Sequence, residues 1–106
     1  MTAPVPQGFP AILDLSGRPC LLVGGGRIAL RKAEQLIASG ADLSVIAPAI
    51  DPGFAALPVR TFERTYISGD LEGFWLVVTA TGNEVVDQQI FDEAEAARVW
   101  CNSADD

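Results

Sequence analysis

Three consecutive glycines at the end of an apolar run are the residues of this sequence best suited to chemistry. Residues 24–29 read GGGRIA, which fits the pattern G-x-G-x-x-A of dinucleotide-binding turns. In that pattern Gly24 allows the tight turn from strand to helix, Gly26 leaves room for a pyrophosphate, and Ala29 keeps the helix close to the sheet. The N–H groups at the helix N-terminus then attract the anion. The sequence thus predicts a dinucleotide site.

A glycine turn also joins strand and helix in many α/β proteins that bind no nucleotide, so the pattern needs a βαβ unit around it. That unit is present. Small and apolar residues recur at helical spacing from Ala29 to Gly40, where we expect the helix to stop. Residues 43–47 then form a second apolar segment of strand length, ended by Pro48. This context favours the dinucleotide interpretation over a purely structural turn.

The remaining chain continues the alternation of strands and helices. We expect an α/β, Rossmann-like, doubly wound parallel sheet with strand order 3-2-1-4-5. A helix capped by Asn83 should bury one stripe, formed by Val86, Ile90, Ala94 and Ala97. The expected strands are 20–24, 42–47, 59–62, 74–78 and 99–101, with a first helix at 27–39, a turn or short helix at 48–58 and a polar loop at 63–73.

In such a sheet, ligands bind beyond the carboxyl ends of the strands, near the point where the strand order reverses. Three segments are expected at that edge: residues 24–28, 47–49 and 79–83. The third segment has a structural alternative, because Thr, Gly and Asn are also ordinary residues of helix caps and turns.

The composition is that of one small globular domain. With 106 residues and 49% hydrophobic side chains, the chain is expected to form a single dinucleotide-binding domain over residues 1–106. Its net charge of −7 disfavours nucleic acid and anionic lipid as partners. No apolar run approaches the roughly 20 residues of a membrane span, and the N-terminus lacks the pattern of a secretory signal. We therefore expect a cytoplasmic protein without a membrane segment.

The chain contains no histidine, which removes the commonest general base and the commonest metal ligand. A Ser-His-Asp triad is excluded within it, and we expect no metal site. Its two cysteines, Cys20 and Cys101, fall in apolar strand segments. We interpret them as buried thiols in a reducing compartment, although the sequence also allows a disulfide.

Several segments together resemble one known family. They are the lead-in at 10–12, the run GRPCLLVGGGRIALRKA at 17–33, SGA at 39–41, LVVTATGN at 76–83 and the closing CNSADD at 101–106. In this order the chain resembles the N-terminal domain of sirohaem synthase, the precorrin-2 dehydrogenase and sirohydrochlorin ferrochelatase family. The resemblance covers nearly all of the sequence.

The resemblance implies NAD-dependent oxidation of precorrin-2 to sirohydrochlorin, and in some members also the insertion of ferrous iron. It assigns Asp105, the aspartate of an N-x-x-D segment, a catalytic role. It also implies that Gly24, Gly25, Gly26, Arg27 and Ile28 bind the pyrophosphate and that Pro48 and Ala49 lie near the adenosine ribose. From their place at the carboxyl edge of the sheet, Ala47, Thr81 and Gly82 are further expected cofactor-binding residues.

The chain departs from the family pattern in places. Gly82 and Asn83 stand where acidic residues are usual, and Asp87 stands where an asparagine is common. Residues 103–104 replace a bulkier apolar pair. The sequence given ends at Asp106, whereas family members continue into a dimerisation segment and a helical domain that help to form the tetrapyrrole cleft. We therefore expect a tetrapyrrole substrate and consider a homodimer, with the cleft incomplete in this chain.

The proposed base needs a raised pKa to accept a proton near neutral pH. Burial and repulsion from the adjacent Asp106 would both raise the pKa of Asp105, although two solvated acids are the alternative. The polycarboxylate substrate needs basic partners such as Arg27, Arg31 and Lys32, of which the last two also fit a solvated helix face. The competing functions are a non-catalytic dinucleotide-sensing regulatory domain and a domain that binds nothing.

Overall fold

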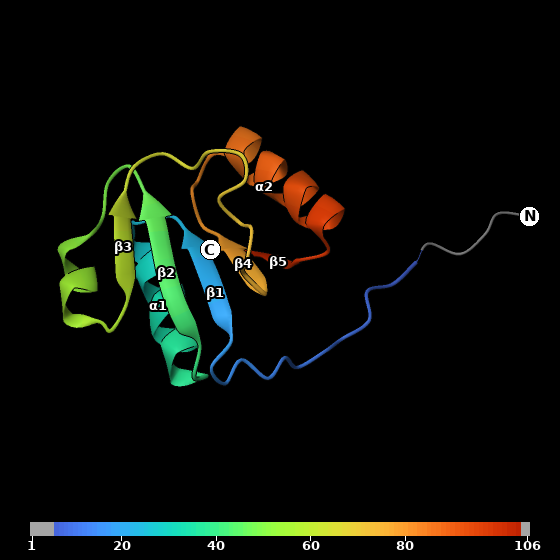
Figure 1. Ribbon diagram of the computed structural model, residues 1–106, viewed down its shortest axis with the longest axis horizontal. Coiled ribbons are helices and arrows are strands. Elements are labelled where there is room, and N and C mark those ends of the chain that lie inside the picture. Colours follow the sequence, from blue (N-terminus) through green and yellow to red (C-terminus); the bar gives the residue numbers. More distant parts are fainter. Residues whose placement is uncertain (1–5, 105–106) are drawn as a thin grey trace, which may run out of the picture.

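A single parallel sheet forms the centre of the molecule. The computed structural model describes residues 6–104, and its five strands lie in the order β3-β2-β1-β4-β5 (Figure 1). Each neighbouring pair runs parallel. This confirms the predicted Rossmann-like sheet with order 3-2-1-4-5. The strands are β1 (Pro19–Val23), β2 (Asp42–Ala47), β3 (Arg60–Glu63), β4 (Leu76–Thr79) and β5 (Trp100–Ser103).

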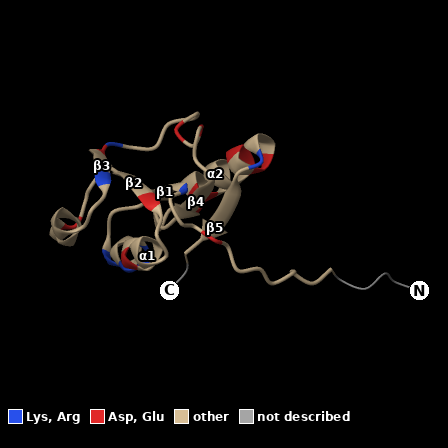
Figure 2. Ribbon diagram, turned by 60° about the horizontal axis from the view of Figure 1, so that its bottom comes forward, with Lys and Arg blue, Asp and Glu red and all other residues tan. Residues whose placement is uncertain are grey.

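One helix covers each face of the sheet. Helix α1 (Arg27–Ala38) and helix α2 (Glu84–Ala97) lie on opposite sides in Figure 2, and the short 3-10 helix η1 (Pro52–Ala56) follows β2. Successive residues of β1 accordingly enter different cores. Cys20 and Leu22 pack in the cluster that includes α1, while Leu21 and Val23 pack in the cluster that includes α2. This two-sided burial explains why residues 20–23 of β1 are all apolar rather than alternating with polar ones.

Helix α1 packs closely because its buried side chains are small. Ala29, Ala33 and Leu36 recur at intervals of four and three residues and form its buried face, as the helical spacing predicts. The chain leaves the helix through Gly40, whose φ is +85°. A glycine takes this left-handed backbone conformation without steric cost, so it ends the helix where the sequence predicts.

Strand β4 and helix α2 differ in detail from the prediction. The apolar run predicted as a strand at 74–78 forms β4 over Leu76–Thr79. Trp75 lies just before the strand, and the Arg18 guanidinium carbon lies 4.2 Å from the centre of its ring. Helix α2 buries Ile90 and Ala94 as predicted, but Ala97 is exposed. The helix ends at Ala97, and its C-cap residue Arg98 takes the left-handed conformation.

The lead-in at residues 6–14 is extended, and Figure 1 shows it running away from the domain. Phe9 and Ile12 are exposed there, and Leu15 is the first residue of the core. Both cysteines are free thiols: Cys20 is buried as predicted, whereas Cys101 on the edge strand is half-buried. In residues 6–104 no helix combines the length and the apolar character that crossing a bilayer requires.

Candidate functional site

The predicted segments meet in one cleft at the carboxyl edge of the sheet. The cleft measures about 790 Å³ and opens where the strand order reverses, between β1, β2 and β4. Its walls include every predicted cofactor-binding residue: Gly24, Gly25, Gly26, Arg27, Ile28, Ala47, Pro48, Ala49, Thr81 and Gly82. Asp105 lies outside the described residues.

Gly24, Gly25 and Gly26 have different structural roles. A Cβ on Gly24 would lie 2.3 Å from the backbone oxygen of Ala80, and a Cβ on Gly25 would lie 2.1 Å from that of Ala49. These two glycines therefore let the three cleft segments approach one another. A Cβ on Gly26 would meet nothing within 4 Å. Gly26 instead borders the open space in which a ligand would approach the backbone.

Backbone hydrogen bonds fix this arrangement. The N–H of Gly24 donates to Ile46 O at 2.9 Å, and the N–H of Asp51 donates to Gly25 O at 2.7 Å. On the other side, the N–H of Ala80 donates to Val23 O at 2.8 Å. The glycine turn is thus bonded to both flanking segments, which gives the cleft a preformed floor.

The two helices that begin at this edge differ in how their N-termini are satisfied. Gly26 caps α1 without a side chain, and the first turn of α1 carries no acidic residue. At α2, the Asn83 side chain accepts from the N–H groups of Val85 at 3.0 Å and Val86 at 3.3 Å. The N-terminus of α1 therefore remains available to an anion, whereas that of α2 is already capped.

The structural alternative for residues 79–83 is thus partly correct. Asn83 is a helix cap, while Thr81 and Gly82 line the cleft. The Thr81 hydroxyl donates to Asp87 Oδ1 at 2.6 Å and accepts from the N–H of Asn83 at 3.0 Å. Gly82 has φ +71°, which suits the turn that joins β4 to α2.

The side of the cleft next to β2 carries a carboxylate. Asp51 follows Ala49 in the cleft wall, and its Oδ1 accepts from the N–H of Gly53 at 2.8 Å. Dinucleotide-binding folds use an acidic residue near the end of the second strand to bind the adenosine ribose. Here the nearest acid on the chain lies beyond β2, on the loop that leads to η1.

The loop between β3 and β4 contributes two cleft residues that the sequence analysis missed, Thr65 and Tyr66. Tyr66 is buried in the core that includes α2, and its hydroxyl donates to Glu93 Oε1 at 2.6 Å. Burial and the Glu93 carboxylate raise the pKa of Tyr66 far above its usual value, so it stays a neutral donor. Two large, mainly apolar side chains in this otherwise polar loop, Tyr66 and Leu71, are the sequence signal for a packed segment.

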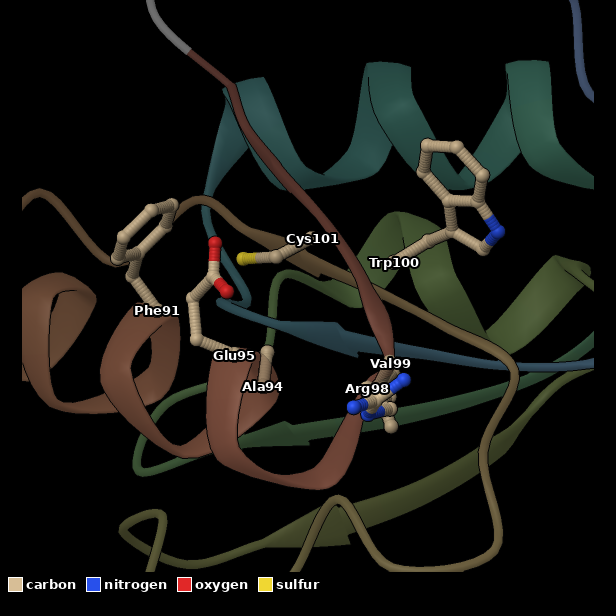
Figure 3. A pocket seen from close by; sticks show the side chains of 7 residues that line it. All are labelled: Phe91, Ala94, Glu95, Arg98, Val99, Trp100 and Cys101. Carbon is tan, nitrogen blue, oxygen red and sulfur yellow. The ribbon is translucent and has the colours of Figure 1, made fainter.

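A second pocket lies at the opposite end of α2 and contains none of the predicted site residues. It measures about 310 Å³ and lies between the last turns of the helix and β5. Figure 3 shows its lining residues, with Cys101 directed towards Phe91 and Glu95 and Trp100 on the other side of the edge strand. It has no glycine turn and no helix N-terminus, so the dinucleotide features belong to the larger cleft.

Residues 6–104 contain no group of three or more His, Cys, Asp or Glu side chains arranged to hold a metal ion. The donor set of the larger cleft is instead backbone N–H groups, one arginine and hydroxyls, with Asp51 at its β2 side. That set suits a phosphate-containing organic cofactor.

Proteins of similar sequence include siroheme synthases of several bacteria. The chain is 39% identical over 102 residues to "Siroheme synthase 3" of Aeromonas hydrophila subsp. hydrophila and 41% identical over 102 residues to "Siroheme synthase" of Edwardsiella ictaluri. Each alignment covers 92% of this chain but 22% of the relative. The chain thus spans about a fifth of the length of these relatives.

A solved structure has the same fold. "SirC, precorrin-2 dehydrogenase" superimposes with a TM-score of 0.70 and 29% sequence identity, over 76% of this chain and 43% of the other. A family model described as "Putative NAD(P)-binding", NAD_binding_7, matches residues 11–106. These matches confirm the resemblance to sirohaem synthase, and the chain belongs to this NAD(P)-binding family.

Proposed function

We propose that this chain is the NAD-binding domain of an NAD-dependent precorrin-2 dehydrogenase of sirohaem biosynthesis. The observation that carries the proposal is the open space at Gly26, directly in front of the uncapped N-terminus of α1. The names of the similar proteins, siroheme synthase and precorrin-2 dehydrogenase, supply the substrate.

The cleft residues divide into three groups for such a cofactor. Residues 24–28 would hold the pyrophosphate through backbone N–H groups and the Arg27 side chain. Ala47, Pro48 and Ala49 would lie against the adenosine ribose. Thr81 and Gly82, at the β4 side, would receive the nicotinamide half. NAD, once bound, accepts the hydride, while the protein positions the substrate and removes the proton.

Asp105 is the proposed base for that proton. Its predecessor Ala104 is held beside β4, because its N–H donates to Thr79 O at 2.8 Å. Thr79 in turn ends the strand that precedes Thr81 in the cleft wall. With no histidine in the chain, a carboxylate is the available residue type for a general base.

The substrate is a polycarboxylate, whereas the chain has a net charge of −7. Figure 2 shows that Lys and Arg are spread over several elements, with basic residues on α1. Of these, Arg27 lines the cleft. We therefore propose that Arg27 meets substrate or cofactor and that segments beyond the residues present here complete the tetrapyrrole site. A homodimer, iron insertion and a cytoplasmic location belong to the same proposal, the last supported by the two free thiols.

A dinucleotide-sensing regulatory domain is the second candidate, because it would use the same cleft without Asp105. Two measurements separate the candidates. Calorimetric titration of the 106-residue chain with NAD should show binding. Turnover of precorrin-2 with NAD by the complete polypeptide should then produce NADH and sirohydrochlorin. Binding without turnover would favour the sensor, and no binding would overturn both functions.

A further inference from the structure

The carboxylate of Asp87 does not line the cleft but forms a hydrogen bond to a residue that does. It lies half-buried in the first turn of α2, and its Oδ1 accepts a hydrogen bond from the Thr81 hydroxyl at 2.6 Å. Thr81 itself lines the cleft. The contact also fixes the β4–α2 turn, since the same hydroxyl accepts the N–H of Asn83. The position of this carboxylate relative to the cleft is therefore set by two hydrogen bonds in series.

The fold determines which half of a dinucleotide faces this carboxylate. The pyrophosphate belongs at the N-terminus of α1, and the adenosine half extends towards the end of β2. The nicotinamide half must then extend to the other side of β1, where β4 and the Thr81 turn lie. Asp87 thus stands behind the nicotinamide side of the cleft.

The charge of Asp87 is not neutralised by a basic side chain. Within residues 6–104 the ion pairs are Arg60–Asp42 and Arg64–Asp70, and neither involves Asp87. Its field extends to β5, where it adds to burial in raising the pKa of the Cys101 thiol. A half-buried charge is also screened less by salt than an exposed one.

We propose that Asp87 makes this cleft prefer oxidised NAD+ to reduced NADH, an inference that rests on the proposed function. The nicotinamide ring carries a positive charge in NAD+ and none in NADH, so a nearby carboxylate stabilises the oxidised form selectively. An enzyme that starts its reaction with NAD+ benefits, because the product NADH is bound less tightly and leaves. An asparagine at position 87, which is common in the resembled family, would still accept the hydrogen bond from Thr81 but would carry no negative charge.

The test compares ligands that differ in the charge of the ring. The dissociation constants of NAD+, NADH and ADP-ribose, which lacks the ring, are measured by calorimetry on the 106-residue chain. In Asp87→Asn the preference for NAD+ over NADH should fall by roughly three- to tenfold. The ratio of NADH to ADP-ribose affinities should not change, since neither ligand carries the ring charge.

Two further variants isolate the cause. Asp87→Glu keeps the charge and should retain the NAD+ preference. Asp92→Asn removes a carboxylate from the exposed face of α2, where it accepts from Gln88 Nε2, and should leave all three constants unchanged.

An unchanged NAD+ to NADH ratio in Asp87→Asn, with both ligands still bound, would overturn this inference and leave the proposed function intact. If Asp87→Asn unfolds, Asp87→Glu decides: a lost preference in that folded variant refutes a charge effect, and a retained one supports it. Failure of the unaltered chain to bind any of the ligands would instead overturn the proposed function itself.

Discussion

The Tyr66 hydroxyl donates to Glu93 Oε1 at 2.6 Å and so joins the β3–β4 loop to helix α2. The same oxygen accepts from the N–H of Gly69 at 3.2 Å. Within the loop, Arg64 pairs with both oxygens of Asp70 at 2.7 and 3.0 Å. These contacts give a long connection the fixed position that a cleft wall needs.

Replacing Tyr66 by Phe should lower the free energy of unfolding by about 1–2 kcal/mol, because a hydrogen bond to a charged acceptor is lost. Urea denaturation measures this change. Glu93→Gln, which retains an acceptor, should cost less. Hydrogen exchange should become faster over residues 64–74 in Tyr66→Phe. Equal exchange in both proteins would show that packing alone holds the loop.

The loop should also loosen in acid. Hydrogen bonds from Arg64 and the N–H of Ile67 lower the pKa of Asp70, and a hydrogen bond from Tyr66 lowers that of Glu93. A carboxyl whose pKa is lower in the folded state stabilises the fold above its unfolded pKa, and that stabilisation is lost as pH falls through the folded value. Stability should therefore decline below about pH 4, and Asp70→Asn should flatten the decline. If the stability of Asp70→Asn declines with falling pH as steeply as that of the unaltered chain, Asp70 does not contribute to the acid sensitivity.

The glycine turn allows a test that separates ligand binding from folding. Gly26 has an extended backbone, with φ −87° and ψ −162°, and open space at its Cβ position. Gly26→Val should therefore fold and should lose NAD binding, because the side chain fills the space needed by the pyrophosphate. Gly24→Ala should instead lower the free energy of unfolding by at least about 2 kcal/mol, since φ is +137° and the added Cβ meets Ala80. Calorimetry measures the loss of NAD binding in Gly26→Val, and thermal melting measures the loss of stability in Gly24→Ala. Unchanged NAD affinity in a folded Gly26→Val variant would show that the glycines have only a structural role.

The sheet and the cleft floor could be predicted because their signals are local. The apolar run of β1, the glycines and the helical spacing of Ala29, Ala33 and Leu36 all lie within one short segment. Each of these signals determines the local structure of the same residues that carry it, through their backbone conformation or their burial. The parallel pairing of β1 with β2 and of β4 with β5 then follows from connecting each pair by a helix.

The missed features depend on partners distant in the sequence. Tyr66 is a cleft residue because it packs in a core built by other elements and bonds to Glu93, 27 positions further on. Ala97 is exposed because it lies in the last turn, next to the left-handed C-cap at Arg98, whereas Ala94 is the last buried residue of the stripe. Spacing along the chain carries no information about either event.

The cofactor should be NAD rather than NADP. Asp51 lies in the cleft wall on the β2 side, where its carboxylate would repel a 2′-phosphate and accept a hydrogen bond from the ribose hydroxyl. Because Asp51 lies beyond β2 and already accepts from Gly53, NAD affinity should be modest. Asp51→Asn should reduce discrimination between the two cofactors. Tenfold tighter binding of NADP by the unaltered chain would refute this assignment.

Asp105→Ala in the complete polypeptide should reduce precorrin-2 oxidation and spare NAD binding. General base catalysis typically contributes about 10²–10⁴-fold, so a loss of that size is expected in turnover. NAD binding should be retained, because the proposed cofactor contacts come from the glycine turn and the β4–α2 turn. Asp106→Ala is the matched control and should cost less, since the N-x-x-D segment that begins at Asn102 ends at Asp105. Single-turnover rates with saturating NAD measure the chemical step directly. Near-normal turnover in Asp105→Ala, or greater damage from Asp106→Ala, would show that the base is another residue.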